Sequence, residues 1–170
     1  MKSTRVIVSS ICTLVILSVT SHAKEWRGII PMKSTCEDVK RVLGVDTCNP
    51  PDGVYDLGGE EVRINFSKSP CVEAFGKSWS VPVGTVLAIL HRPKSPVDIA
   101  QLALDVSKYK ITNTDVVGLD AYHNEEEGIW FEAFEGTAQN IHYLPAKRDA
   151  RLQCKADGLK SAKAKKRRKS

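Results

Sequence analysis

The chain of 170 residues lacks the short motifs by which most enzymes and cofactor-binding domains are identified. It has no C-x-x-C pair, no H-x-H or H-E-x-x-H spacing and no G-x-S-x-G, so no motif supports a reactive thiol, a zinc site or a serine hydrolase. The run Gly76-Lys77-Ser78 matches only the end of a phosphate-binding loop, because Cys71 stands where that motif requires glycine. The sequence therefore names no reaction.

The chain also has no apolar run that reaches the length of a membrane-spanning helix, which is about 20 residues. The apolar residues 6–19 follow the basic Lys2 and Arg5 and precede a small-x-small sequence that ends at Ala23. This order predicts a cleaved signal peptide over residues 1–23, and hence a secreted or periplasmic protein with no transmembrane segment after cleavage. The remaining 147 residues are enough for one compact domain, which we expect over residues 24–154.

Positive charge is scarce in that domain and concentrated after it. Residues 24–154 hold 15 basic and 19 acidic residues, a net charge of −4, whereas residues 155–170 hold 8 basic and 1 acidic, a net charge of +7. We expect the latter to form a disordered basic tail. It could bind anionic surface polymers, lipid head groups or extracellular nucleic acid through the cationic residues Lys165, Lys166, Arg167, Arg168 and Lys169.

No aromatic residue in this tail could stack on bases, so the sequence does not predict specific nucleic-acid recognition. The alternative is a solubilising tail without a partner.

Cysteines are few, but their number is even once the signal peptide and its Cys12 are removed. Four cysteines in an exported chain predict two disulfides, with three possible pairings. We favour Cys36–Cys48, which would tie a helix to the following loop, and Cys71–Cys154, which would fasten the middle of the domain to its end. The alternative is a reactive thiol at Cys36, near a helix N-terminus.

One short helix is predicted over residues 35–43. Ser34 and Glu37 have the spacing of a capping box, and Gly44 is suited to the left-handed position that ends a helix. The apolar face of this helix is expected to consist of Cys36, Val39, Val42 and Leu43.

Strands are predicted on both sides of an apolar central segment. Residues 26–31 should form an edge strand or extended arm, and residues 54–57 and 61–66 a hairpin around Gly58-Gly59. Residues 85–91 are apolar without alternation, which favours a strand covered on both faces. The segment 72–82 is expected to be irregular, with Phe75 and Trp79 covering the core.

The C-terminal third is predicted to be a meander. Residues 99–106 could be strand or short helix, whereas residues 119–123, 129–134 and 137–144 should be strands. A helical turn is expected over residues 145–152. One helix among hairpins predicts an α+β domain: a short N-terminal helix packed on a mostly antiparallel, disulfide-linked sheet.

Three histidines and a run of glutamates are the candidates for chemistry. His91, His123 and His142 lie on predicted strands, and Glu125 begins the run that Glu126 and Glu127 continue. These residues could hold zinc or manganese in a metal-assisted hydrolase, but their spacing is not that of a known metal motif. A solvated turn and ordinary strand histidines explain the same residues, so we assign no catalytic residue, no metal and no cofactor.

Several sequence words occur together between residues 26 and 154: W-R-G-I-I-P, S-T-x-x-D-V-x-x-x-L-G, V-R-I-N-F-S-x-S-P-C, W-x-V-P-x-x-T-V, N-E-E-E-G-I and R-L-Q-C. In these the chain resembles an uncharacterised family of exported proteins from soil and acidobacterial genomes. The resemblance implies a bacterial, exported, disulfide-linked domain without a known activity, and it fits pairing of Cys71 with Cys154.

More weakly, the helix that ends at Leu43-Gly44 before a hairpin is similar to small envelope modules of the SmpA/OmlA type, which act by protein contact. The function expected from the sequence is therefore that of an exported non-enzymatic domain with protein or envelope partners. The alternatives are a metal-assisted hydrolase and a binder of anionic polymers or membrane surfaces through the tail.

Overall fold

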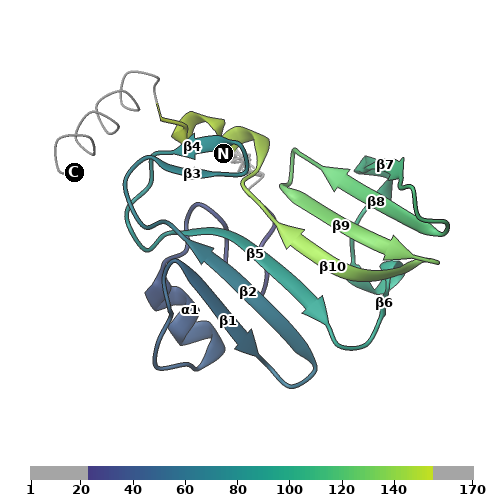
Figure 1. Cartoon of the computed structure of the whole chain (residues 1–170), viewed down its shortest axis with the longest axis horizontal. Coiled ribbons are helices and arrows are strands. Elements are labelled where there is room, and N and C mark those ends of the chain that lie inside the picture. Colours follow the sequence, from purple (N-terminus) through teal and green to yellow (C-terminus); the bar gives the residue numbers. More distant parts are fainter. Residues whose placement is uncertain (1–22, 155–170) are drawn as a thin grey trace, which may run out of the picture.

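A computed structural model describes residues 23–154 of the protein. The predicted basic tail and nearly all of the predicted signal peptide lie outside the described residues. Within them, one antiparallel sheet dominates, and its strands run in the order β1-β2-β5-β10-β9-β8-β7, with β6 paired to β10 (Figure 1). The strands are β1 (Asp52–Asp56), β2 (Glu60–Phe66), β5 (Val86–Pro93), β6 (Val97–Asp98), β7 (Lys110–Asn113), β8 (Leu119–Asn124), β9 (Ile129–Phe134) and β10 (Thr137–Tyr143).

A second, two-stranded sheet is the hairpin of β3 (Val72–Ala74) and β4 (Lys77–Trp79). The helical elements are α1 (Cys36–Leu43) and three 3-10 segments: η1 (Ile99–Leu102), η2 (Val106–Lys108) and η3 (Lys147–Leu152). The predicted α+β class is confirmed in its coarse form, although the sheet makes up most of the domain.

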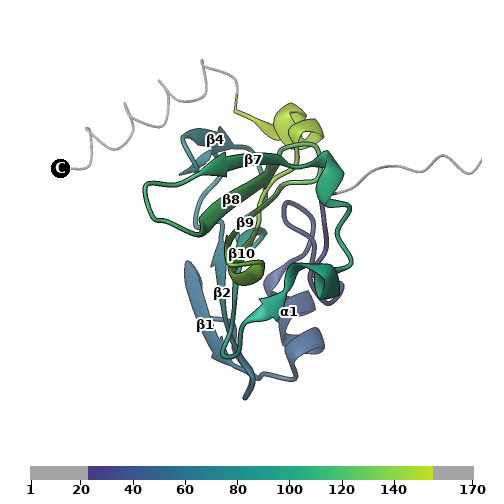
Figure 2. The same cartoon turned by 90° about the vertical axis from the view of Figure 1, so that its right-hand side faces the viewer.

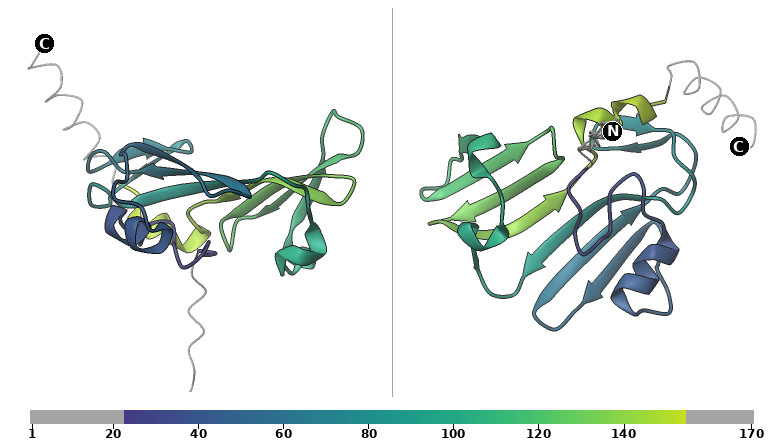
Figure 3. Two further views of the ribbon diagram at one scale, coloured as in Figure 1. Left: turned by 90° about the horizontal axis from the view of Figure 1, so that it is seen from below. Right: turned by 180° about the vertical axis from the view of Figure 1, so that it is seen from behind.

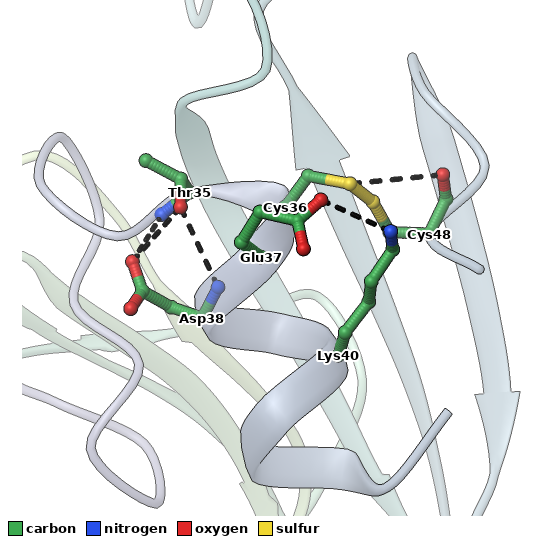
Figure 4. Close-up of a disulfide and its surroundings, with 6 residues drawn as sticks. All are labelled: Thr35, Cys36, Glu37, Asp38, Lys40 and Cys48. Atoms are coloured by element: carbon green, nitrogen blue, oxygen red, sulfur yellow. Dashed lines mark hydrogen bonds and ion pairs between the residues drawn. A yellow bond between two sulfur atoms is a disulfide. The ribbon is translucent and has the colours of Figure 1, made fainter. Parts of the chain in front are cut away.

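The helix α1 begins one residue later than its predicted cap. Thr35, not Ser34, is the N-cap: its hydroxyl accepts from the N–H of Asp38, whose carboxylate accepts from the Thr35 N–H at 2.9 Å (Figure 4). The predicted Ser34–Glu37 capping box is therefore wrong. The Ser34 hydroxyl already accepts from the N–H of Ile30 at 2.9 Å, in the turn before the helix.

The predicted end of α1 is confirmed, whereas its predicted apolar face is not. Gly44 has φ 66° and closes the helix with a left-handed C-cap, as predicted. The apolar face is narrower than expected, because only Val39 is buried and Val42 is exposed.

The segment before α1 is a tight turn, so the edge strand or extended arm predicted over residues 26–31 is wrong. The backbones of Trp26 and Ile29 exchange two hydrogen bonds of 3.0 and 2.8 Å across Arg27 and Gly28, which both have positive φ. Trp26 and Ile29 are buried in the same cluster as Val39 and Ile64. Glycine at position 28 lets the chain reverse here and place both apolar side chains under the sheet.

The predictions of the central strand, of the hairpin around Gly58-Gly59 and of the C-terminal meander hold. β5 lies between β2 and β10 and has four consecutive buried residues, from Val86 to Ile89. The first hairpin turns at Gly58-Gly59, where the Leu57 N–H donates to the Glu60 carbonyl, and the C-terminal meander β8-β9-β10 is present. Residues 72–82, expected to be irregular, contain the β3–β4 hairpin, and η1 resolves the ambiguity over residues 99–106 in favour of helix.

The four cysteines within residues 23–154 form the two pairs that we favoured. Cys36 and Cys48 have Cα atoms 5.8 Å apart (Figure 4), and Cys71 and Cys154 have Cα atoms 5.7 Å apart. The second pair joins Cys71, directly before β3, to Cys154, two residues after the end of η3. In residues 23–154, no helix is long and apolar enough to cross a membrane.

Candidate functional site

The two faces of the large sheet differ in what covers them. Seen edge-on, α1 and the segment around η1 lie on the same side of the sheet (Figure 3, left; Figure 2). Strand residues that point to this side are fully or almost fully buried, among them Val62, Ile64, Ile89, Phe131 and Ile141. We call this side the covered face. Because side chains alternate along a strand, the residues between them lie on the opposite side, which we call the open face.

A row of large side chains crosses the open face from strand to strand. The register places His123 of β8 opposite Trp130 of β9, Trp130 opposite His142 of β10, and His142 opposite Leu90 of β5. Arg63 of β2 continues the row beside Leu90 and is exposed. The rings of Trp130 and His142 contact each other, with centroids 4.3 Å apart and planes inclined by 52°.

A second, polar row lies beside the first. Arg92 of β5 donates to Asn140 of β10 at 3.2 Å and contacts Glu61 of β2 at 3.5 Å. Asn140 in turn donates to Glu132 of β9 at 3.0 Å. These four side chains therefore hold one another in place across β2, β5, β10 and β9, and present planar polar groups on a rigid surface.

The electrostatics of this face keep His142 neutral at pH 7. Burial lowers the pKa of its imidazole below the ordinary value of 6.5, and nearby Arg92 lowers it further, while Glu132 opposes both. A neutral imidazole against the Trp130 ring can donate one hydrogen bond and accept another. The row thus combines an aromatic surface with polar groups of both kinds.

A pocket of about 310 Å³ opens at one end of the open face. Three segments that are distant in sequence line it: the β3–β4 hairpin, the β8 end with its turn, and the link from β10 to η3. The lining residues are Phe75, Lys77, Trp79, His123, Glu125, Gly128, Leu144, Pro145, Ala146, Lys147 and Ala150. Phe75 also borders a second pocket of about 270 Å³, on the side of β1, β2 and β5.

The walls of the first pocket are fastened together by the backbone. The Ser80 N–H donates to Leu152 at 2.7 Å and the Cys154 N–H to Ser78 at 2.9 Å, so the hairpin is paired with the end of η3. The Lys147 N–H donates to the Glu125 carbonyl at 2.8 Å and joins η3 to the β8–β9 turn. Together with Cys71–Cys154, these bonds make the pocket a preformed feature of the domain.

The predicted metal-site residues do not converge. His91 lies on the covered face beside Trp26, with its Nε2 atom 2.5 Å from a carboxylate oxygen of Glu60. His123 and Glu125 share the pocket, but His142 stands two strands away, about 9–10 Å at normal strand spacing.

In the strand register Trp130 lies between His123 and His142, and its ring contacts His142. No group of three or more His, Cys, Asp or Glu side chains in residues 23–154 could hold a metal ion.

The residues that sequence reasoning did not identify as a site are Trp130, Phe75 and Lys77. Alternation over residues 129–134 could have placed Trp130 opposite the buried Ile129 and Phe131. The expectation that Phe75 covers the core is wrong: its side chain is 51% exposed, at the tip of the β3–β4 hairpin with φ 54°. Trp79 is buried as expected, and its indole N–H donates to the Ala74 carbonyl at 3.1 Å.

Comparison with known proteins adds nothing to this geometry. No family model, no curated protein and no solved structure matches the chain.

Proposed function

We propose that this protein is an exported, non-enzymatic domain that acts by contact, and that the open face of its sheet is the contact surface. The observation that carries the proposal is the difference between the two faces. α1, the Trp26–Ile29 turn and η1 bury one of them, while the other presents His123, Trp130 and His142 beside a preformed pocket.

The polar row supports contact rather than folding as the role of this face. Arg92, Asn140 and Glu132 are linked by hydrogen bonds and still partly accessible, so a partner would meet ordered groups and pay little side-chain entropy on binding. Aromatic residues with polar groups around them are also typical of interface centres. Two cysteine pairs and the resemblance to exported bacterial proteins support a location outside the cytoplasm, with an envelope component or protein as the partner.

Site-specific photo-crosslinking in cells that export the protein tests this proposal. A photoreactive amino acid replaces Arg63 on the open face in one variant and Arg41 on α1 in the other, both exposed arginines. Adducts from position 63 and none from position 41 are expected. Equal adducts from both positions, or adducts from position 41 alone, would contradict the proposal.

A second candidate function follows from the charge distribution. The domain has a net charge of −4 and residues 155–170 have +7, so the tail could bind anionic polymers independently of the sheet. Deletion of residues 155–170 separates the two functions. If the tail is the binding element, the deletion abolishes retention on an anionic polymer. If the open face acts alone, adducts from position 63 persist.

A further inference from the structure

We propose that the pocket between the β3–β4 hairpin and the β10–η3 link binds a small monocarboxylate with an apolar body. This inference rests on the proposed function, because the pocket lies on the same side of the domain as the proposed contact surface. It goes further by naming the chemistry of a ligand.

The size and composition of the pocket fit a small organic molecule. Its volume of about 310 Å³ is at the lower end of the range for ligand pockets, about 300–1,000 Å³. Most of its wall is apolar, and this part consists of Phe75, Trp79, Gly128, Leu144, Pro145, Ala146 and Ala150. Such a wall with few polar groups is the usual arrangement in small-molecule sites.

The charges of the pocket favour a single negative charge on the ligand. Its titratable groups are the ammonium groups of Lys77 and Lys147, the carboxylate of Glu125 and the imidazole of His123. Lys147 is committed to a salt bridge with Glu126, which raises the pKa of the ammonium. Lys77 makes no ion pair with any of residues 23–154, so it is the group available to a carboxylate.

Other charge types fit this set less well. A cationic ligand would meet the ammonium of Lys77, unpaired within residues 23–154, and a dianion such as phosphate would meet the Glu125 carboxylate with only that one lysine to offset it. A carboxylate placed at Lys77 would leave the apolar body of the ligand to the apolar wall of the pocket. Burial of that body and the charged hydrogen bond would then act together.

The pocket is also ordered before any ligand arrives. Cys71–Cys154 and the backbone bonds between β4 and the end of η3 hold the hairpin against the rest of the domain. At Gly128, with φ 68°, a Cβ atom would lie 2.2 Å from the Leu144 carbonyl oxygen, so the turn can approach β10 this closely only with glycine. A preformed pocket costs a ligand less entropy than one that must be assembled.

The test is an NMR titration of ¹⁵N-labelled protein of residues 24–170 with 3-phenylpropionate, its neutral amide 3-phenylpropanamide and the amine 3-phenylpropylamine. Saturable shifts are expected at the Trp79 indole N–H, Gly128 and Lys147 with the carboxylate. The amide should bind roughly tenfold more weakly, since a charged hydrogen bond is lost. Lys77→Gln should remove that difference. The matched control is Lys68→Gln, in the pocket on the other side of Phe75, which should leave carboxylate affinity unchanged.

Three results would overturn the assignment of a monocarboxylate: equal binding of the amide or the amine, shifts centred on Leu87 and Asn65 instead, or no saturable shift with any of the three probes. None of them contradicts the proposed function if crosslinks from position 63 persist. Loss of those crosslinks while 3-phenylpropionate still binds would instead contradict the open face as the partner surface and retain the pocket.

Discussion

The covered and open faces of the sheet are built from alternate residues of the same strands, yet they serve different purposes. On β9, Phe131 is fully buried between Tyr122, stacked at 4.7 Å, and Tyr109, while its neighbours Trp130 and Glu132 remain partly accessible. The covered face supplies most of the apolar burial, whereas the two rows of the open face are held by hydrogen bonds and one ring contact. A smaller apolar cluster joins Leu87 of β5 to the β3–β4 hairpin. A strand can therefore stabilise the fold and form a contact surface at once, because its two sides are independent.

The largest expected effect on stability comes from Phe131, and its comparison with the adjacent Trp130 tests whether the two faces of β9 are independent. Phe131→Ala should lower the free energy of unfolding by roughly 3–5 kcal/mol, because it leaves a cavity in a closed cluster. Trp130→Ala should cost under about 2 kcal/mol, since its ring is already partly in water. Urea denaturation of both variants gives the comparison. Similar losses for the two would show that the open face is part of the core.

The next effect concerns the hairpin that borders the open face. Replacing Cys71 and Cys154 by serine should cost about 4 kcal/mol, because a link over 83 residues no longer restricts the unfolded chain. Replacing Cys36 and Cys48, which are 12 residues apart, should cost less for the same reason. Urea denaturation of both double variants measures the order. A reversed order would mean that native contacts, and not chain entropy, dominate.

A smaller effect is expected on the covered face, at the start of α1. Thr35→Ala should cost about 1 kcal/mol, because it removes one half of the capping box. Glu37→Ala, which affects only an exposed salt bridge to Lys40, should change the stability by less than about 0.5 kcal/mol. The urea midpoints of the two variants are compared. A larger loss for Thr35→Ala supports the observed Thr35–Asp38 cap, and a larger loss for Glu37→Ala would support the predicted Ser34–Glu37 cap.

The smallest expected effect is a pH dependence from the open face. Burial lowers the pKa of His142 in the folded state below 6.5, so the unfolded chain binds this proton more readily. The contribution to stability is present above about pH 6.5 and is lost as the pH falls through the lowered value. His142→Gln should flatten the stability profile in this window, as measured by denaturation at several pH values. An unchanged slope would assign the dependence to His91, whose pKa burial also lowers.

Much of the fold could be predicted because its signals are local. Alternation over residues 61–66 and 129–134, the apolar run that became β5 and the glycines at positions 44, 58 and 59 all depend on neighbours in sequence. The errors were of two kinds. At the start of α1, Thr35 forms the N-cap that the pattern assigned to Ser34, whose hydroxyl instead accepts from Ile30. At Trp26, a tight turn stands where the pattern predicted an extended segment. At Phe75, an apolar residue was assumed to be buried, although its position at a hairpin tip exposes it.

The candidate site was much less accessible to sequence reasoning. His123 and Glu125 were named for a metal, but their neighbours in the pocket come from residues 75–79 and 144–150. His91 and His142 looked equivalent as strand histidines, yet they lie on opposite faces of the sheet.

By itself, the sequence determined most of the strand and helix segments, the number of cysteine pairs and the separation of a net acidic stretch from a basic one. Those properties follow from residue type and short-range periodicity, which act within a few residues. Only the tertiary structure decided which sheet face is covered, which histidines are separated and where the pocket lies. These depend on strand order and on contacts such as Cys71–Cys154, which join residues far apart in the chain.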